Sequence, residues 1–420
     1  MVVHRLHAGV TVLLTWDAGC IDAACVRSKT AGKVTRMFDF ETPVNRRDTA
    51  SLKWEHYGTR DVVPMWVADM DFPSPPAVME ALHRRVDHGV FGYTLPPREL
   101  IGVMLEMLAR EYGWRVREEW LVFLPGLVCG LNVTCRAVGG PGDAVVTFTP
   151  VYPPFLTAPK LSRRELVTVP LRDAGTRWEM DLQALEASIT PRTRLLLLCS
   201  PHNPAGRVWT RAEQRALAEV VERHDLIVCS DEIHAGLVLD AGLRHVPFAA
   251  LSPEIASRTI TLHAPSKTYN VPGLGCAFAV IPDEHLRRAF RGAMDGIVPH
   301  VNLLGYEAAL ASYRDGEPWR QELLAVLRRN AARVNEVVSQ MPGLRTWPVE
   351  ATHLAWIDAR GLGMAEPGGF KDPTRFFEDA GVGLSDGTPF GAPGFVRLNF
   401  GCPPSQLETA LQRMKTALGV

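Results

Sequence analysis

The sequence has little of what marks a nucleic-acid-binding, membrane or metal-binding protein. Acidic and basic residues nearly cancel to a formal net charge of −1, so no basic excess is available for a phosphodiester backbone. No stretch approaches the roughly 18 apolar residues that a membrane-spanning helix requires. None of the eight cysteines forms a C-x-x-C pair. We therefore expect no nucleic acid partner, no membrane span and no metal.

Signals for secretion are also weak. A short apolar stretch, Ala8–Leu14, follows Arg5 and resembles a signal peptide, but Trp16 and Asp17 end it without a clean cleavage site. Asp17 also argues against lipid attachment at Cys20. Two other cysteines end apolar runs that indicate buried strands, namely Cys199 and Cys229. Buried free thiols fit a reducing compartment, so we expect a cytoplasmic protein.

The remaining composition is that of a globular enzyme-sized chain. Hydrophobic residues make up 46% and charged residues 22% of the 420 residues, which predicts a full core and two closely associated domains. Between residues 75 and 291 apolar runs alternate with helical patterns, which favours a mostly parallel sheet covered on both faces. The expected strands are Leu121–Leu124, Ala144–Thr147, Arg194–Cys199, Leu226–Ser230, Thr259–His263 and Ala277–Ile281.

Capping signals help to place the helices. A helix is predicted over Arg211–His224, because Thr210 and Glu213 form a capping box. A long helix is expected after Trp319, to about Met341. The last part of the chain mixes helices with two expected strands, Leu354–Asp358 and Val396–Phe400. The final helix is predicted to begin with a second capping box, Ser405 with Glu408, in a smaller α+β domain.

Ligands of parallel sheets bind at the carboxyl ends of the strands, and two ionisable residues follow strands there. Lys267 is one of only seven lysines against 38 arginines, and it follows an apolar strand. A desolvated lysine has a lowered pKa and can act as a nucleophile and a base, although a solvated loop lysine is the alternative. Asp231 ends a second strand. Its carboxylate could keep a ring nitrogen protonated, or it could be a helix cap or part of a buried ion pair.

Two further residues have matching chemistry. Asn203 lies in the tight loop Ser200–Gly206, where its amide could donate a hydrogen bond, although a plain turn would use the same residues. Arg397 lies in a late apolar strand. Its guanidinium could bind a carboxylate in bidentate fashion, or it could form a structural salt bridge.

Taken together, these motifs resemble those of fold-type I enzymes that depend on pyridoxal 5′-phosphate (PLP). The resemblance extends from about Met37 to Val420 and is closest to the MalY/PatB group of cystathionine β-lyases, which are carbon–sulfur lyases. The segments that carry it are Met37–Phe40, Pro64–Pro73, His88–Tyr93, Leu198–Pro204, Ser230–His234 and Phe395–Pro403.

This resemblance implies an α/β fold of PLP fold-type I, with a mostly parallel, seven-stranded type of sheet in a large domain. We expect an N-terminal extension over residues 1–36 that is disordered or dispensable. Residues 37–74 would form an arm joined to the small domain. The large PLP-binding domain would cover residues 75–315, and the small C-terminal α+β domain residues 316–420.

The resemblance also assigns roles to residues. Lys267 would hold PLP as a Schiff base and act in catalysis with Asp231, which would face the pyridine nitrogen. Arg397 would bind the substrate carboxylate. The other expected cofactor contacts are Asn203 and His234 near the phenolic oxygen, Tyr152 stacked on the ring, Gly126, Leu127, Val128 and Ser266 at the phosphate, and Tyr93 reaching the phosphate from a neighbouring subunit. The contact from Tyr93 implies a homodimer.

The chain departs from this group at three positions. Ala264 replaces a serine that usually touches the phosphate, for which Ser266 or Thr268 could compensate. His353 stands where relatives tend to have an aromatic residue, and His300 falls in a segment that relatives place at the dimer mouth. Both histidines are possible specificity changes.

The expected activity is cleavage of L-cystathionine or another L-cysteine S-conjugate to a thiol, pyruvate and ammonia. Two alternatives share the first steps: an aminotransferase, and a decarboxylating or deaminating enzyme acting on a cysteine-conjugated metabolite. A degenerate fold kept as a binding module would have lost the lysine or the aspartate, and both Lys267 and Asp231 are present.

Overall fold

The large sheet is assembled from short apolar segments. A computed structural model of the chain describes residues 37–363 and 372–420. Seven strands run in the order β2-β10-β9-β8-β7-β3-β4, and all are parallel except β10, which is antiparallel to both of its neighbours. The strands are β2 (Leu121–Leu124), β3 (Ala144–Thr149), β4 (Glu165–Pro170), β7 (Thr193–Cys199), β8 (Ile227–Asp231), β9 (Thr259–His263) and β10 (Ala277–Val280). The predicted mostly parallel, seven-stranded sheet is confirmed.

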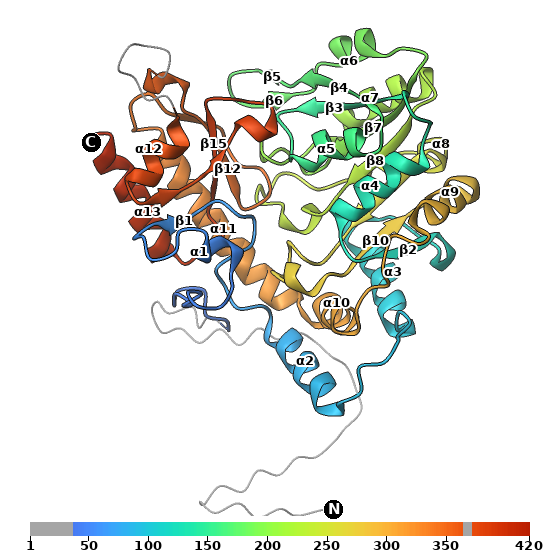
Figure 1. Ribbon diagram of the computed structural model, residues 1–420, viewed down its shortest axis with the longest axis horizontal. Coiled ribbons are helices and arrows are strands. Elements are labelled where there is room, and N and C mark those ends of the chain that lie inside the picture. The colour runs from blue at the N-terminus through green and yellow to red at the C-terminus, as the bar shows by residue number, and fades with distance from the viewer. Residues whose placement is uncertain (1–36, 364–371) are drawn as a thin grey trace, which may run out of the picture. The chain divides into compact units, whose positions relative to one another are not determined.

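Helices cover both faces of this sheet (Figure 1). Successive side chains of a strand point to opposite faces, and β7 shows the result. Leu195 and Leu197 pack with α4 (Leu127–Ala137), α5 (Pro154–Leu161) and α9 (Glu284–Met294). Leu196 and Leu198 pack on the other side with α6 (Leu182–Ser188), α7 (Arg211–Arg223) and α8 (Pro253–Ser257). A strand buried on both faces explains the continuous leucine run.

One local prediction on this sheet is confirmed, and one of its strands escaped prediction. The capping box of α7 is present, with the Glu213 carboxylate accepting from the Thr210 N–H at 2.7 Å and the Thr210 hydroxyl accepting from the Glu213 N–H at 3.2 Å. Strand β4 was not predicted. It is an edge strand in which only Val169 is buried, so its sequence lacks the apolar run of the central strands.

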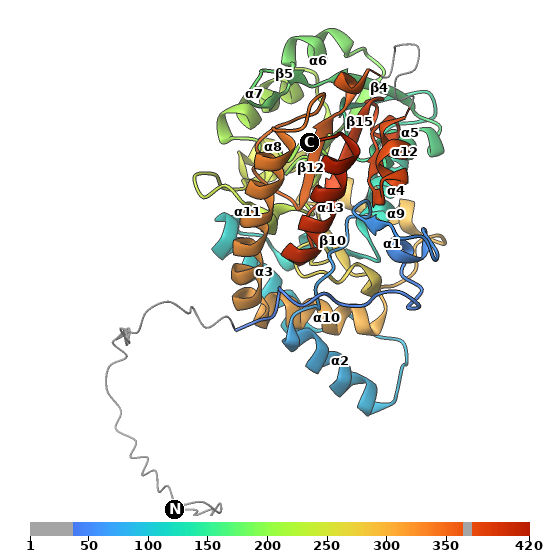
Figure 2. The same ribbon diagram turned by 90° about the vertical axis from the view of Figure 1, so that its left-hand side faces the viewer.

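The C-terminal part has its own antiparallel sheet, in the order β11-β12-β15-β14. These strands are β11 (Arg345–Thr346), β12 (Leu354–Asp358), β14 (Ser385–Asp386) and β15 (Phe395–Asn399). The helices that accompany them are α11 (Glu317–Val338), α12 (Pro373–Asp379) and α13 (Pro404–Ala417), coloured orange to red beside the large sheet in Figure 1 and in front of it in Figure 2.

The N-terminal segment joins this C-terminal part. Strand β1 (Val63–Pro64) pairs in parallel with β13 (Val382–Gly383), although more than 300 residues separate the two strands. The remaining α-helices are α1 (Leu52–Glu55), α2 (Pro76–His88), α3 (Arg98–Tyr112) and α10 (Leu303–Asp315). Residues 37–420 form one compact unit, so the predicted domain boundaries within it stay predictions. The predicted extension, residues 1–36, lies outside the described residues.

The second predicted capping box is wrong. Helix α13 begins at Pro404, its N-cap is Pro403, and no side chain caps it, so Ser405 already lies inside the helix. Glu408 accepts hydrogen bonds from Arg333 on α11 at 2.7 and 3.0 Å instead. An ion pair between two helices therefore replaces the expected local cap.

The burial of two cysteines agrees with another expectation. Cys199 and Cys229 are buried free thiols, as their apolar runs predicted. None of the helices in the described part of the chain is long and apolar enough to cross a membrane.

Candidate active site

A cavity of about 660 Å³ opens at the carboxyl ends of the parallel strands. Ten of the positions predicted from the sequence line it, and they come from segments spread over most of the chain. These positions are Gly126, Leu127, Val128, Tyr152, Asn203, Asp231, His234, Ser266, Lys267 and Arg397. The structure thus brings together in one place the residues that the motifs singled out.

Neighbouring strands explain why four of these residues meet. Asp231 is the last residue of β8, and Asn203, Lys267 and Tyr152 follow β7, β9 and β3. The four strands are consecutive in the sheet order β9-β8-β7-β3. Parallel neighbours end at the same edge, so short loops suffice to turn the four side chains into one cavity.

Lys267 is held by the main chain of a distant segment. Its ammonium group donates a hydrogen bond to the carbonyl oxygen of Ala68 at 2.6 Å. Burial, with a smaller contribution from the nearby Arg397 guanidinium, lowers the pKa of Lys267 to about 8. A substantial fraction of this amine is therefore neutral near pH 8, which an ordinary surface lysine does not achieve.

Burial shifts the pKa of Asp231 in the opposite direction from that of Lys267. Its carboxylate accepts one hydrogen bond from the N–H of Ile233, at 3.1 Å. Burial, with a smaller contribution from the neighbouring Glu232, raises the pKa of Asp231 to about 7, although the Ile233 N–H and the charge of Lys267 act in the opposite direction. A buried carboxylate of this kind is stabilised when a cationic group binds next to it.

Arg397, on β15, is a buried cation with no acidic partner among the residues that the structure describes. Its guanidinium donates to Asn203 Oδ1 at 3.1 Å, to the Trp66 carbonyl at 3.0 Å and to Ser385 Oγ at 3.3 Å. It also lies over the ring of Phe390, at 4.7 Å from the centroid. Its Nε has no acceptor, and burial lowers the pKa of Arg397 to about 10.

The acceptors of Arg397 are all neutral, which argues against the alternative that this residue forms a structural salt bridge. Within residues 37–363 and 372–420, no carboxylate forms an ion pair with this guanidinium. A buried arginine of this kind is a strong site for an incoming carboxylate, because burying an unpaired charge is costly.

The amino end of helix α4 offers an anion site at the cavity wall. Gly126 is the N-cap and supplies no side chain, and the first described intrahelical bond runs from the Gly130 N–H to the Gly126 carbonyl. The N–H groups of Leu127, Val128 and Cys129 therefore have no helical partner. Together with the helix dipole, these groups favour a phosphate.

Two buried histidines lie close together near Lys267. His234 lines the cavity, and burial together with the charge of Lys267 lowers its pKa to about 3. His353 is fully buried, and its ring centroid lies 6.0 Å from that of His234. Neither of its ring nitrogens has a hydrogen-bond partner in the described part of the chain. Burial lowers the pKa of His353 as well. Both rings are therefore neutral at ordinary pH.

Other predicted positions lie elsewhere. Tyr93 is fully exposed on the segment after α2, and His300 is exposed after α9. Thr268 does not line the cavity, whereas Ser266 does, so only Ser266 is placed to compensate for Ala264. His353 also lies outside the lining.

Two main-chain groups of the site, the carbonyls of Trp66 and Ala68, were not predicted from the sequence. The segment Pro64–Pro73 that contains them stands out in the sequence only by its resemblance to the family.

Comparison with known proteins gives the class. Residues 60–414 match the family of class I and II aminotransferases, and the chain belongs to that family. Within the family the chain is related to cystathionine β-lyases. It is 36% identical to cystathionine β-lyase PatB of Bacillus subtilis, over 90% of this chain and 100% of that relative.

Solved structures agree with this relationship. The crystal structure of OvoB is 46% identical with a TM-score of 0.88, covering 91% of this chain and 99% of that one. Cystalysin from Treponema denticola, whose crystal structure contains PLP, is 32% identical with a TM-score of 0.85, covering 91% and 99%. The fold is therefore PLP fold-type I, and the chain is a PLP-dependent enzyme of the cystathionine β-lyase-like branch.

The chemistry of the cavity fits this cofactor. The uncapped start of α4 suits a phosphate, and the carboxylate of Asp231 suits a protonated pyridine nitrogen. The amine of Lys267 suits an aldehyde, because its lowered pKa leaves part of it neutral and nucleophilic. Tyr152, half-buried in the lining, provides a flat ring for stacking.

Proposed function

We propose that this enzyme is a carbon–sulfur β-lyase that cleaves an L-cysteine S-conjugate, such as L-cystathionine, to a thiol, pyruvate and ammonia. The observation that carries the proposal is the meeting of Lys267, Asp231 and Arg397 in one cavity of a chain related to cystathionine β-lyases. The reaction breaks the bond between the β-carbon and sulfur and consumes one water molecule.

Arg397 would orient the substrate. Its guanidinium has no acidic partner and a free Nε, so an α-carboxylate can bind to it in bidentate fashion. The contact with Asn203 Oδ1 fixes the plane of the guanidinium and leaves the Asn203 amide NH₂ to donate toward the phenolic oxygen of PLP.

Lys267 would hold PLP covalently and, when an amino acid takes its place, remove the proton from the α-carbon. Bound PLP supplies an electron sink, which makes that proton acidic and allows a thiolate to leave from the β-carbon. Asp231 would keep the ring nitrogen protonated, because its buried carboxylate stabilises a cation there. The lowered pKa of Lys267 matches the task of a base near neutral pH.

The other lining residues would hold the cofactor in register. The N–H groups at the start of α4 and the Ser266 hydroxyl would bind the phosphate. Tyr152 would stack on the pyridine ring, and His234 would lie near its phenolic oxygen. His234 is neutral, so it would act there as a hydrogen-bonding group rather than as a charge.

Tyr93 points to a homodimer. It is fully exposed, on a segment with other exposed apolar side chains, among them Phe91 and Leu95. If a second copy uses Tyr93 at its phosphate, light scattering will give a dimer, and Tyr93→Phe will weaken PLP binding by roughly tenfold, the value of one charge-assisted hydrogen bond. An active monomer, or unchanged PLP affinity, would count against this arrangement.

The reaction type can be tested with a panel of cysteine thioethers. We expect L-cystathionine or another member to release thiol, pyruvate and ammonia in equal amounts, with no 2-oxo acid added. The family match to aminotransferases makes transamination the second candidate. That reaction would require an amino acceptor and would leave the thioether bond intact. Acceptor-dependent turnover without thiol release would therefore reject the lyase and leave the PLP enzyme standing.

A further inference from the structure

An irregular segment over residues 65–71, here called the strap, connects β1 to the start of α2 and forms part of the cavity wall. Trp66, Val67 and Ala68 line the cavity. The Trp66 carbonyl accepts from Arg397 at 3.0 Å, and the Ala68 carbonyl accepts from Lys267 at 2.6 Å. One main-chain segment therefore holds both Arg397 and Lys267, the two basic side chains of the proposed mechanism.

Two asparagines attach the strap to the same segments that carry these cations. Asn399, two residues after Arg397, donates to the carbonyls of Val67 and Asp69 at 2.5 and 2.7 Å. Asn270, three residues after Lys267, accepts from the Met70 N–H at 2.9 Å and donates to the Met70 carbonyl at 2.9 Å. A displacement of the strap would therefore move both functional side chains.

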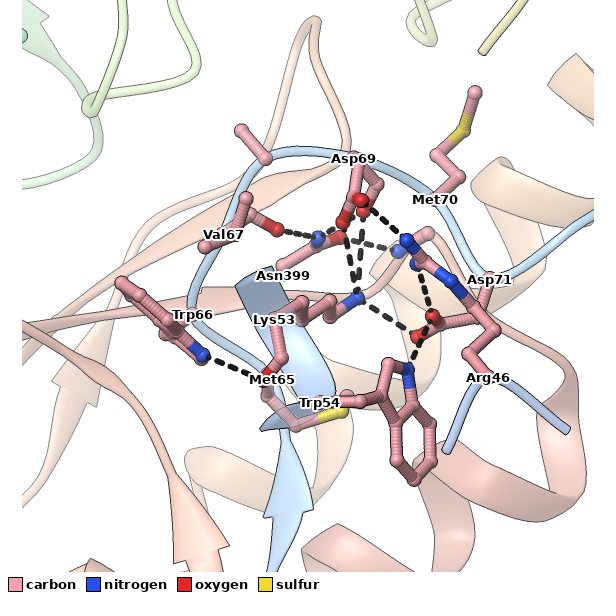
Figure 3. Close-up of polar contacts among 12 residues, drawn as sticks. Arg46, Lys53, Trp54, Met65, Trp66, Val67, Asp69, Met70, Asp71 and Asn399 are labelled. Atoms are coloured by element: carbon pink, nitrogen blue, oxygen red, sulfur yellow. Dashed lines mark hydrogen bonds and ion pairs between the residues drawn. The ribbon is translucent and has the colours of Figure 1, made fainter. Parts of the chain in front are cut away.

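The far end of the strap rests on a buried ion pair (Figure 3). Lys53, on α1, and Asp71 lie 2.7 Å apart, and neither side chain has any exposed surface. Lys53 also donates to the carbonyl of Asp69 at 3.3 Å, so it holds the strap at two points. The Trp66 indole donates back to the Lys53 carbonyl at 3.1 Å, which ties α1 to the beginning of the strap as well.

Asp71 is surrounded by donors. Besides Lys53 it accepts from Arg46 at 2.7 Å, from Trp54 at 2.9 Å and from Gln406 at 2.8 Å. Its own N–H donates to the Gly401 carbonyl at 2.8 Å. These donors, Lys53 first among them, hold the pKa of Asp71 below its usual value in spite of its burial. The carboxylate is therefore ionised at neutral pH.

A buried ion pair is a costly way to hold two segments together. Desolvation offsets most of the attraction, and well-packed apolar residues of similar size often give equal or greater stability. What an ion pair supplies is a defined geometry, and a proton-transfer site needs that, since an error of about 1 Å can cost a hundredfold in rate.

We propose that Lys53 and Asp71 are positioning residues of this enzyme: their buried ion pair sets the path of the strap, so that the carbonyls of Trp66 and Ala68 hold Arg397 and Lys267 in the geometry for catalysis. The inference rests on the proposed roles of Lys267 and Arg397. Neither Lys53 nor Asp71 lines the cavity, so both act through the strap.

The test replaces Lys53 with methionine, which has a similar length but no charge. In the PLP-loaded enzyme we expect kcat to fall by roughly 10- to 100-fold on the best cysteine thioether, with a higher KM, because both cations lose their alignment. Hydrogen exchange should become faster in the strap, where the Met65, Met70 and Asp71 N–H groups are now hydrogen-bonded.

Arg164→Met is the matched control. Arg164 is also a buried base, but it donates only to main-chain carbonyls and lies next to the start of the edge strand β4, whereas the cavity opens at the carboxyl ends of the strands. The Arg164→Met variant should have a lower melting temperature but unchanged kcat, unchanged KM and unchanged hydrogen exchange in the strap. If Lys53→Met does not fold, Asp71→Asn, which keeps the size of the side chain, provides the same measurements.

Wild-type kcat and KM in Lys53→Met would overturn the inference, as would an equal loss in Arg164→Met. Exchange that accelerates throughout the protein, rather than in the strap, would reduce the pair to a structural role and overturn it too. The exchange readout needs no substrate. Failure of the lyase proposal in the product assay is therefore distinguishable from failure of the strap.

Discussion

Replacing Lys267 with alanine is expected to abolish the visible absorption of the PLP-loaded protein and to lower turnover by roughly 10³-fold or more. No other amine is described in the cavity lining, so no side chain can replace Lys267 in binding the cofactor covalently. The measurement is an absorption spectrum after dialysis, followed by a pyruvate assay.

A suitable control is Lys160→Ala, because Lys160 is exposed on α5 and does not line the cavity. That variant should keep both the spectrum and the rate. A visible band that survives dialysis in the Lys267→Ala protein would show that the central assignment of this lysine is wrong.

Asp231→Asn is the second large effect. Asparagine keeps the size of the side chain and can still accept the hydrogen bond from Ile233, but it has no charge to hold the ring nitrogen protonated. We expect PLP to remain bound and turnover to fall by roughly 10²- to 10³-fold, as when one electrostatic stabiliser of a transition state is removed. Single-turnover measurements would place the loss in the chemical step.

The neighbouring Glu232 offers a close comparison. It is also buried, but its carboxylate accepts from Ser230, His245 and Phe248 and does not line the cavity. Glu232→Gln should therefore retain most of the turnover, whatever it costs in stability. Similar losses in both variants would indicate a general sensitivity of this strand end and would remove Asp231 from its assigned role.

The central sheet could be predicted because burial on both faces leaves long apolar runs in the sequence. Strands β2, β9 and β12 have their predicted bounds, while the edge strand β4 escaped because its exposed face dilutes that signal. The capping box predicted for α13 was wrong for another reason. Ser405 and Glu408 have the right spacing, but a long-range contact with Arg333 decides the outcome.

The residues of the site also differ in how visible they are in the sequence. Lys267, Asp231 and Asn203 were found because polar side chains at the end of an apolar strand are visible in sequence, and Arg397 because it is a charge inside one. The carbonyls of Trp66 and Ala68 were not, since every residue has a carbonyl and only the path of the chain makes these two special. Lys53 was missed because its segment, Ser51–Glu55, shows no apolar run that would predict a buried charge.

In the strap, Lys267 and Arg397 are held by main-chain carbonyls and not by side chains. The shape of the cavity wall can therefore change without loss of these acceptors. A carbonyl acceptor survives almost any substitution at its own residue, and Val67, which lines the cavity, contributes its carbonyl to the strap. The side chain of Trp66, by contrast, donates to the Lys53 carbonyl and must be kept. Mutations at Val67 can therefore explore the size and polarity of the leaving group while the acceptors for Lys267 and Arg397 stay in place. Libraries restricted to residue 67 should yield altered preferences with few inactive members.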